Sequence, residues 1–290
     1  MNTKVILAIL VLAHASLACG FSIDLPERRS AGPEIEESIT VAQPKPALSG
    51  DEASNQTRLR LEFGAGTLTL SPGAARGNLV DGTVVYNIEE LKPETLKDGN
   101  NIEITQGDFK GLPPFDEIIN DWYLHLGDTP FDLVIQGGAY KGRFELGGLA
   151  LKSLSVRDGA SDVELSFEEL NQTEMSLLRY ETGASKVTLT GLANANFSTL
   201  MFSGGAGNYS LDFSGELQRD AVVTIEAGFG DLSLVIPGDV DAVVTVEGTA
   251  LNINHSSGWS QNGQKYTQDA SGPRLTVLVK MAAGNLVITD

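Results

Sequence analysis

Alternating hydrophobic and polar positions recur along the chain after Thr57. Each copy has an alternating stretch, a short glycine-containing loop, and a second alternating stretch. Alternation with a period of two is typical of β-strands that are buried on one side. The copies are Arg58–Leu70, Asp132–Leu146, Leu154–Phe167, Leu178–Leu189, Leu200–Phe213, Val223–Ile236, Val244–Ile253 and Leu275–Ile288.

The spacing of the copies predicts the fold. The first apolar residue after the loop falls at Val163, Val187, Tyr209 and Leu232, which are 24, 22 and 23 residues apart. No helical periodicity separates the copies. We therefore predict an all-β chain that forms a single β-solenoid, with coils of about 22–24 residues that bury their apolar sides by stacking.

The loop glycines are predicted to be structural turn residues. Each loop must redirect the chain within a few residues, which favours a positive φ, and stacked coils leave little room for a side chain. The glycines concerned are Gly64, Gly66, Gly159, Gly183, Gly205, Gly207, Gly228, Gly230 and Gly284.

The residue just before each second strand forms a further predicted column. Stacking in register places its members about 4.8 Å apart, so Asp162 is expected to meet Lys186 as an exposed ion pair, with Asn208 separating Lys186 from Asp231. The members are Thr67, Asp162, Lys186, Asn208, Asp231 and Asn285.

Residues 58–290 are expected to be one domain, with an irregular N-terminal part (58–148) and regular coils (149–290). The rhythm breaks between Asn78 and Pro130. Within this stretch, Leu91–Asp98 and Gly107–Asp116 are interpreted as loops. Three segments are predicted strands: Val84–Ile88, Asn101–Ile104 and Trp122–Leu126.

The N-terminus resembles a secretion signal over residues 1–18, with a positive Lys4, an apolar run and a small-residue cleavage site. Cys19, the only cysteine, follows that site directly and is predicted to carry a lipid; the alternative is ordinary cleavage that leaves a free thiol. Residues 19–57 are predicted to be a flexible tether, in which Ile39–Val41 has the pattern of a short edge strand.

The composition of the chain excludes some classes of partner. The net charge of −18 argues against nucleic acid as a partner, because phosphate repels an acidic surface. The 32 glycines indicate many tight bends.

Ser203–Asp212 resembles a calcium-binding nonapeptide, but Tyr209 stands where the ligand aspartate is required. His125 and His255 are far apart in sequence and do not predict a zinc site. No cofactor or metal is expected, although a serine–histidine triad assembled by the fold stays open.

The enzymatic alternative is a β-solenoid that degrades polysaccharide with converging carboxylates. Binding of polysaccharide without catalysis would instead use exposed Trp122, Trp259 or Tyr266. Solvated surface positions and core packing are the simpler interpretations of these residues, so we expect no enzyme. The acidic candidates are Asp158, Asp162, Glu164, Asp212 and Asp231.

Three segments resemble the toast-rack domain of bacterial envelope proteins: Asp158–Phe167, Thr182–Phe197 and Gly204–Gly215. That family is related to the cell-wall-active antibiotic response proteins, including LiaF. The resemblance extends from about Ser38 to Asp290, and it implies a β-helical lipoprotein or surface domain without enzymatic activity. It supplies no catalytic residues. LiaF-type sensors carry transmembrane helices, which this chain lacks after its signal.

Together these features predict a non-catalytic protein of the bacterial cell envelope, lipid-anchored to the membrane through Cys19, whose solenoid is a scaffold, adhesion or binding surface linked to envelope stress. A secreted protein is the alternative. The expected partner is an envelope protein or a polysaccharide. The last strand, near Leu286–Ile288, is expected to end the stack, and its edge is predicted to be capped by Trp259–Tyr266 or to mediate self-association.

Overall fold

The computed structural model describes residues 31–44, 56–107 and 118–290. The predicted signal peptide, Cys19, and nearly all of the expected loop at Gly107–Asp116 therefore lie outside the described residues.

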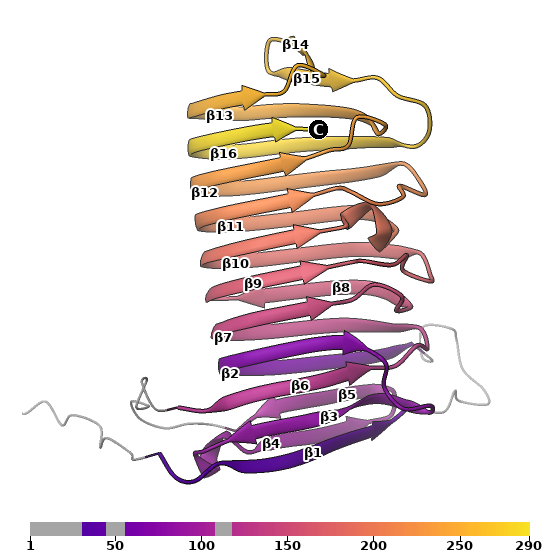
Figure 1. Ribbon diagram of the computed structural model, residues 1–290, viewed down its shortest axis with the longest axis vertical. Helices are drawn as coiled ribbons and strands as arrows, with labels where there is room; N and C mark the ends of the chain where they lie inside the picture. The colour runs from indigo at the N-terminus through magenta and orange to yellow at the C-terminus, as the bar shows by residue number, and fades with distance from the viewer. Residues whose placement is uncertain (1–30, 45–55, 108–117) are drawn as a thin grey trace, which may run out of the picture.

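The prediction of a β-solenoid is confirmed (Figure 1). The apolar residues that mark the repeat are direct neighbours: Val187 pairs with Val163 and Tyr209, and Tyr209 pairs with Leu232. The strands are β1 (Ile35–Ala42), β2 (Thr57–Pro72), β3 (Asn78–Tyr86), β4 (Pro93–Asp98), β5 (Asn101–Gln106), β6 (Asn120–Leu126), β7 (Phe131–Glu145), β8 (Leu151–Asp158), β9 (Ala160–Ser166), β10 (Met175–Thr190), β11 (Phe197–Asp212), β12 (Ala221–Val235), β13 (Asp241–His255), β14 (Ser260–Asn262), β15 (Lys265–Gln268) and β16 (Arg274–Thr289), with 3₁₀ turns η2 (Glu89–Leu91) and η3 (Leu192–Ala195).

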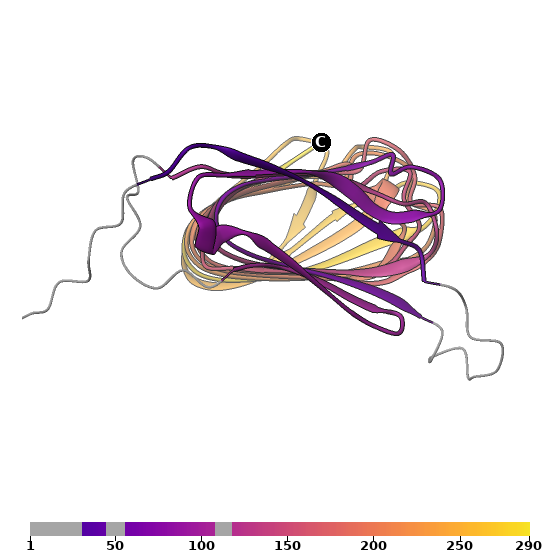
Figure 2. The same cartoon turned by 90° about the horizontal axis from the view of Figure 1, so that it is seen from below.

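Each long strand bends once, at the glycine loop, which we call the corner. In β10 the buried residues before the corner are Leu178 and Tyr180, and those after it are Val187 and Leu189. The buried positions thus change from even to odd numbers across the corner. A shift by one residue turns the side chains of a strand to the opposite face, so this change keeps the apolar side chains facing the interior on both walls. Segments before the corner form the first wall of the solenoid, and segments after it form the second wall; Figure 2 shows the two walls facing each other.

Neighbouring coils pair in parallel from β2 to β16 and β13. At the N-terminal end the walls separate. The first wall continues from β2 into β5 and β4, and the second wall continues into β6, β3 and β1. Strand β2 belongs to both arrangements, so the irregular N-terminal strands are continuous with the regular stack.

Aliphatic side chains from successive coils form columns in the core. One such column crosses the first wall from β2 to β13, and every member is at most 1% exposed. Because each coil contacts mainly its two neighbours, removal of one member affects the coils above and below it. The members, in stack order, are Leu59, Leu133, Leu154, Leu178, Leu200, Val223, Val277 and Val244.

The corner glycines are needed mainly for close approach of the coils. A Cβ atom on Gly183, Gly205 or Gly228 would lie 2.4–2.5 Å from the carbonyl oxygen of the glycine in the preceding coil. The expected positive φ occurs at Gly66, Gly230 and Gly284 only. For the other six the expectation of a positive φ is wrong: five lie within continuous strands and Gly159 joins β8 to β9, and the six are Gly64, Gly159, Gly183, Gly205, Gly207 and Gly228.

One local expectation is corrected and another is confirmed. Leu91–Asp98 is not all loop, since Pro93–Asp98 forms β4, which pairs with β5 through a turn at Gly99 (φ 58°). This strand has an almost fully exposed pattern, so hydrogen bonding rather than burial forms it and no alternation marks it in the sequence. Within the expected tether, Ile35–Ala42 forms β1, which confirms the strand suspected at Ile39–Val41.

The C-terminal strand does not end the stack. Strand β16 lies between β12 and β13, with parallel pairing on both sides, so the expectation of a terminal edge near Leu286–Ile288 is wrong. The expected cap is present in part: β14 and β15 form a hairpin on β13, and Trp259 and Tyr266 are 4% and 2% exposed.

Candidate functional site

The five acidic residues suggested for polysaccharide chemistry do not converge. Asp158 is 6% exposed and lies inside the corner, whereas the other four lie on the outer side of the second wall. One of these, Glu164, forms an ion pair with Arg143 at 3.2 Å. Within the part of the chain that the structure describes, no three His, Cys, Asp or Glu residues are placed to hold a metal ion. The four outer residues are Asp162, Glu164, Asp212 and Asp231.

The buried carboxylate of Asp158 is held by hydroxyl groups. Tyr180 donates to it at 2.7 Å, Tyr140 donates at 3.4 Å, and Thr182 donates to its other oxygen. Burial raises the pKa of the Tyr140 and Tyr180 phenols, and the nearby Asp158 carboxylate raises it further, so both hydroxyls stay protonated as donors. The cluster ties together three coils inside the corner and has a structural role.

The predicted column on the second wall is present in register. Lys186 pairs with Asp162 on one side and with Asn208 on the other, and Asn208 pairs with Asp231. Asp162 also neighbours Lys141 in the preceding coil. Among these described residues, however, Asp162 forms no ion pair with either lysine. An exposed ion pair stabilises a protein by only about 0.2–1 kcal/mol, because the two side chains lose conformational entropy when they are held together. The expected ion pair is therefore wrong, although the register is right.

The structure brings one serine and one histidine together. Ser71 on β2 and His125 on β6 are neighbours at the surface, and Ser71 Oγ lies 2.9 Å from His125 Nδ1. On the other side of β6, Asp81 of β3 is in register with His125. The Asp81 carboxylate instead accepts from the Ala75 N–H at 2.6 Å and from Asn78 at 2.8 Å. The hydrogen bond from Asn78 is the main cause of the lowered pKa of Asp81. A catalytic serine needs a histidine oriented by its own carboxylate, and this arrangement does not provide one.

The aromatic residues suggested as a polysaccharide platform are buried. Trp122, Trp259 and Tyr266 are 0%, 4% and 2% exposed, so the suggestion is wrong. Trp122 packs edge-on against Phe63 in the core, with 5.3 Å between the ring centroids. Its ring N–H donates to Asn120 Oδ1 at 3.0 Å. Tyr209 is also buried, at 3%, which confirms that it begins an inward-facing strand segment.

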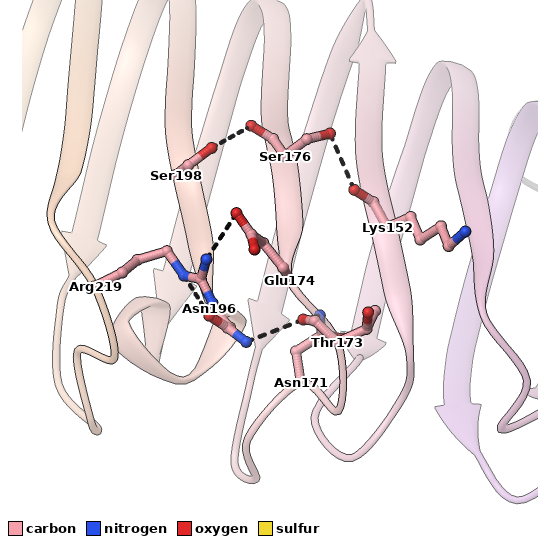
Figure 3. A network of polar contacts seen from close by, with 8 residues as sticks. All are labelled: Lys152, Asn171, Thr173, Glu174, Ser176, Asn196, Ser198 and Arg219. Atoms are coloured by element: carbon pink, nitrogen blue, oxygen red, sulfur yellow. Dashed lines mark hydrogen bonds and ion pairs between the residues drawn. The ribbon is translucent and has the colours of Figure 1, made fainter. Parts of the chain in front are cut away.

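A polar network connects the loops opposite the corner (Figure 3). Arg219 donates to Asn196 Oδ1 at 2.8 Å and forms an ion pair with Glu174 at 2.7 Å. Asn196, at φ 56°, donates in turn to the Thr173 carbonyl at 3.1 Å. Asn171 is 2% exposed and bonds Leu151 and Thr173. These contacts hold successive loops at the coil spacing, so the network is structural.

A column of small residues follows the outside of the corner, with one exception. Phe229 on β12 is 64% exposed and pairs with Ala206 and Ala283. The signal lies in the sequence, because Phe229 stands where every other coil has alanine, four of them within Gly-Ala-Gly or Gly-Ala-Ser; it was not among the residues selected from the sequence. The corresponding alanines are Ala65, Ala139, Ala160, Ala184, Ala206, Ala283 and Ala250.

A cleft of about 470 Å³ lies beside Phe229, over the first-wall side of the corner. Lys280 on β16 is in register between Glu226 on β12 and Glu247 on β13, and its Nζ lies 3.6 Å from Glu226. Gly228 and Gly248, which offer only main-chain atoms, are among the other residues that line the cleft. The exposed ring and this cleft form the candidate functional site, which we call the C-terminal ridge. It offers an apolar anchor, charged groups of both signs and accessible backbone, which suit binding rather than catalysis.

The family described as the N-terminal domain of toast_rack, DUF2154, matches residues 30–177, slightly more than half of the chain. None of the curated proteins matches. Among the described residues, no helix is long and apolar enough to cross a membrane.

Three solved bacterial structures are among those with a similar fold. A proposed cell adhesion protein from Clostridium sporogenes is 19% identical, with a TM-score of 0.47, over 89% of this chain and 99% of that one. A proposed adhesin from Bacteroides fragilis is 12% identical, with a TM-score of 0.44, over 91% and 99%. A proposed lipid-binding protein from Parabacteroides distasonis is 9% identical, with a TM-score of 0.38, over 90% and 99%. We draw no functional conclusion from likenesses at this level.

Proposed function

The chain belongs to the toast-rack family, and on this premise we propose that it is a non-catalytic protein of the bacterial cell envelope that binds another protein through the C-terminal ridge. The exposed ring of Phe229 is the observation that carries the proposal. The scattered positions of the acidic candidates support binding over catalysis, and the burial of Trp122, Trp259 and Tyr266 removes the support for a polysaccharide platform.

An exposed aromatic side chain is the kind of residue that anchors a binding partner. Phe229 is the most exposed of the large hydrophobic residues in the described chain, at 64%. Its neighbours in the column are alanines, so a partner can approach the ring without meeting longer side chains. Aromatic residues that enter a pocket of the partner commonly dominate binding energy.

The position of the ridge also suits contact with a partner. Strand β1 lies at one end of the stack, and the β14–β15 hairpin lies at the other (Figure 1). Strands β12, β16 and β13, which carry the ridge, are near the hairpin end. A lipid on Cys19, which precedes β1, would hold the β1 end toward the membrane and direct the ridge away from it.

The variant Phe229→Ala tests the proposal, because it restores the alanine of the other coils. We expect it to weaken binding of the purified full chain to proteins released from the envelope of the producing bacterium by about tenfold or more, as loss of a hot-spot aromatic does. Thermal unfolding should be unchanged, since the ring is exposed. Surface plasmon resonance against that protein fraction, peptidoglycan sacculi and phosphatidylglycerol vesicles provides the measurement.

The matched control is Tyr123→Ala, which removes an aromatic side chain that is 47% exposed on β6, near the other end of the stack. This variant should bind like the unaltered chain. Equal losses in both variants, or binding to sacculi that does not depend on Phe229, would contradict the assignment of the ridge.

The proposed anchor gives a separate prediction. Cys19→Ala should move the protein from the membrane fraction to the soluble fraction, because no lipid can then be attached at that position. Immunoblots of fractionated cells measure the change. A protein that stays with the membranes after the substitution would show that something other than Cys19 retains it.

A further inference from the structure

Half of the outermost long strand has no neighbour on one side. Strand β13 pairs with β16 along its whole length, from Asp241 to His255. On its other side β15 pairs only with Ala242–Thr245, and the Val246 N–H reaches Gln264. Among the described residues, no strand pairs with that side of Gly248–His255. We call this segment the open edge.

Other edges of the solenoid are protected, and this one is not. Strand β1 carries Glu36 and Glu37, β4 carries Pro93, Glu94, Lys97 and Asp98, and β14 has only three residues. Charges, proline and short length are the usual means of preventing strand addition. Residues 248–254 contain neither proline nor a charged side chain, although the chain as a whole has a net charge of −18.

The open edge also leaves part of the core uncovered. Leu251 and Ile253 are in register with Gly284 and Leu286 of β16 and face the core, yet both stay half-buried. One coil earlier, Leu286 and Ile288 are fully buried. Tyr266 on β15, which pairs with the first-wall half of β13, is 2% exposed, and its ring centroid lies 5.4 Å from that of His255. One more strand on the second wall would cover Leu251 and Ile253 in the same way.

From these observations we propose that the open edge binds an extended peptide segment of a partner protein, which adds to the second wall as one more strand. This goes beyond the proposed function, because the surface is the edge of β13 rather than the Phe229 ring on β12. The segment needs apolar residues at alternate positions to cover Leu251 and Ile253, and few acidic residues, because the chain is strongly acidic.

The hairpin explains why the occupant is one strand and not the same end of a second copy. On the first wall, β15 and β14 extend two strands beyond β13, about 10 Å at the usual strand spacing. Two copies that meet through their open edges would bring both hairpins into the same space. A single added strand instead fits the step between the two walls.

The test uses the purified full chain and a fluorescent synthetic peptide with the sequence of a natural rung, Gly230–Ile236, which pairs through the same columns in the stack. Fluorescence anisotropy should show saturable binding. A peptide with N-methyl groups on alternate amides should not bind, because it cannot complete the main-chain hydrogen bonds. Equal binding of both peptides would overturn strand addition.

Ile253→Lys places a charge on the inward side of the open edge, as natural edge strands do, and should weaken peptide binding by about tenfold or more. Asn254→Lys adds the same charge to the outer side of the strand and should bind normally. Circular dichroism and thermal unfolding identify any variant that fails to fold, and the N-methylated peptide tests the proposal without a variant.

Two further outcomes are decisive. If the unaltered chain sediments as a dimer that Ile253→Lys dissociates, a second copy occupies the edge and the proposal is wrong. Phe229→Ala should leave peptide binding unchanged, so failure of the ridge proposal and failure of the edge proposal can be distinguished.

Discussion

Gly230→Ala is expected to lower the free energy of unfolding by about 3–5 kcal/mol, because the new methyl group meets both backbone strain and a backbone atom. Gly230 has φ 132°, a conformation that L side chains rarely adopt. A Cβ atom there would lie 1.8 Å from the carbonyl oxygen of Gly207 in the preceding coil. Neither atom can move without shifting a coil, so the cost falls on the whole corner. Urea unfolding followed by circular dichroism measures the change.

Two other glycines separate the causes. Gly73 has φ 111° with nothing within 4 Å of its added Cβ, so Gly73→Ala should cost only about 1–2 kcal/mol of conformational strain. Gly238 has neither a positive φ nor a close neighbour, and Gly238→Ala should change stability by less than about 0.5 kcal/mol. If Gly230→Ala were no worse than Gly73→Ala, close stacking would not be what the corner requires.

The corner also shows how far the sequence could predict the fold. Alternation and the spacing from Val163 to Leu232 were sufficient for the coils and their register, because each coil repeats the same burial pattern. The reason for the glycines was only partly predictable. The sequence reveals that a bend occurs, but the distance between Gly183 and the carbonyl of Gly159 depends on how closely two coils stack.

The candidate site was harder to predict for a physical reason. Acidic and aromatic residues were selected by their chemistry, yet Asp158 and Trp122 are buried because their strand positions face the core, and Trp259 is buried between β13 and β14. Phe229 was missed since an apolar residue in an apolar repeat looks like core. Only its place in the column of alanines, which needs the register of several coils at once, identifies it as exposed.

The order of the last strands could not be read from the repeat. A solenoid pattern gives each coil the same columns, so β13 and β16 fit either position equally well. The cap follows β13 in the stack: β15 pairs with β13, and its Tyr266 is 2% exposed there. Local pattern therefore predicted the existence of the last coils but not which of them ends the stack.

The insertion of β16 has a consequence for stability, which Val279→Asp should reveal. Val279 is 0% exposed and lies between Ile225 and Val246, so a carboxylate there would be buried without a partner. We expect a loss of more than about 4 kcal/mol in the stability of the last coils. Thr276→Asp, on the exposed side of the same strand, is the matched control and should change stability by less than about 1 kcal/mol.

The loss should be confined to one end of the stack. Strand β13 reaches the rest of the solenoid only through β16, because its other neighbour is the β14–β15 hairpin. When β16 is displaced, β13 and the hairpin lose their support together, whereas β2, β7 and β10 keep both of their neighbours. Hydrogen exchange measured by mass spectrometry should therefore show rapid exchange in β13, β15 and β16, with protection retained from β2 to β11. Loss of protection in every strand would instead mean that the solenoid unfolds as one cooperative unit, and that the final strand stabilises coils that it does not touch.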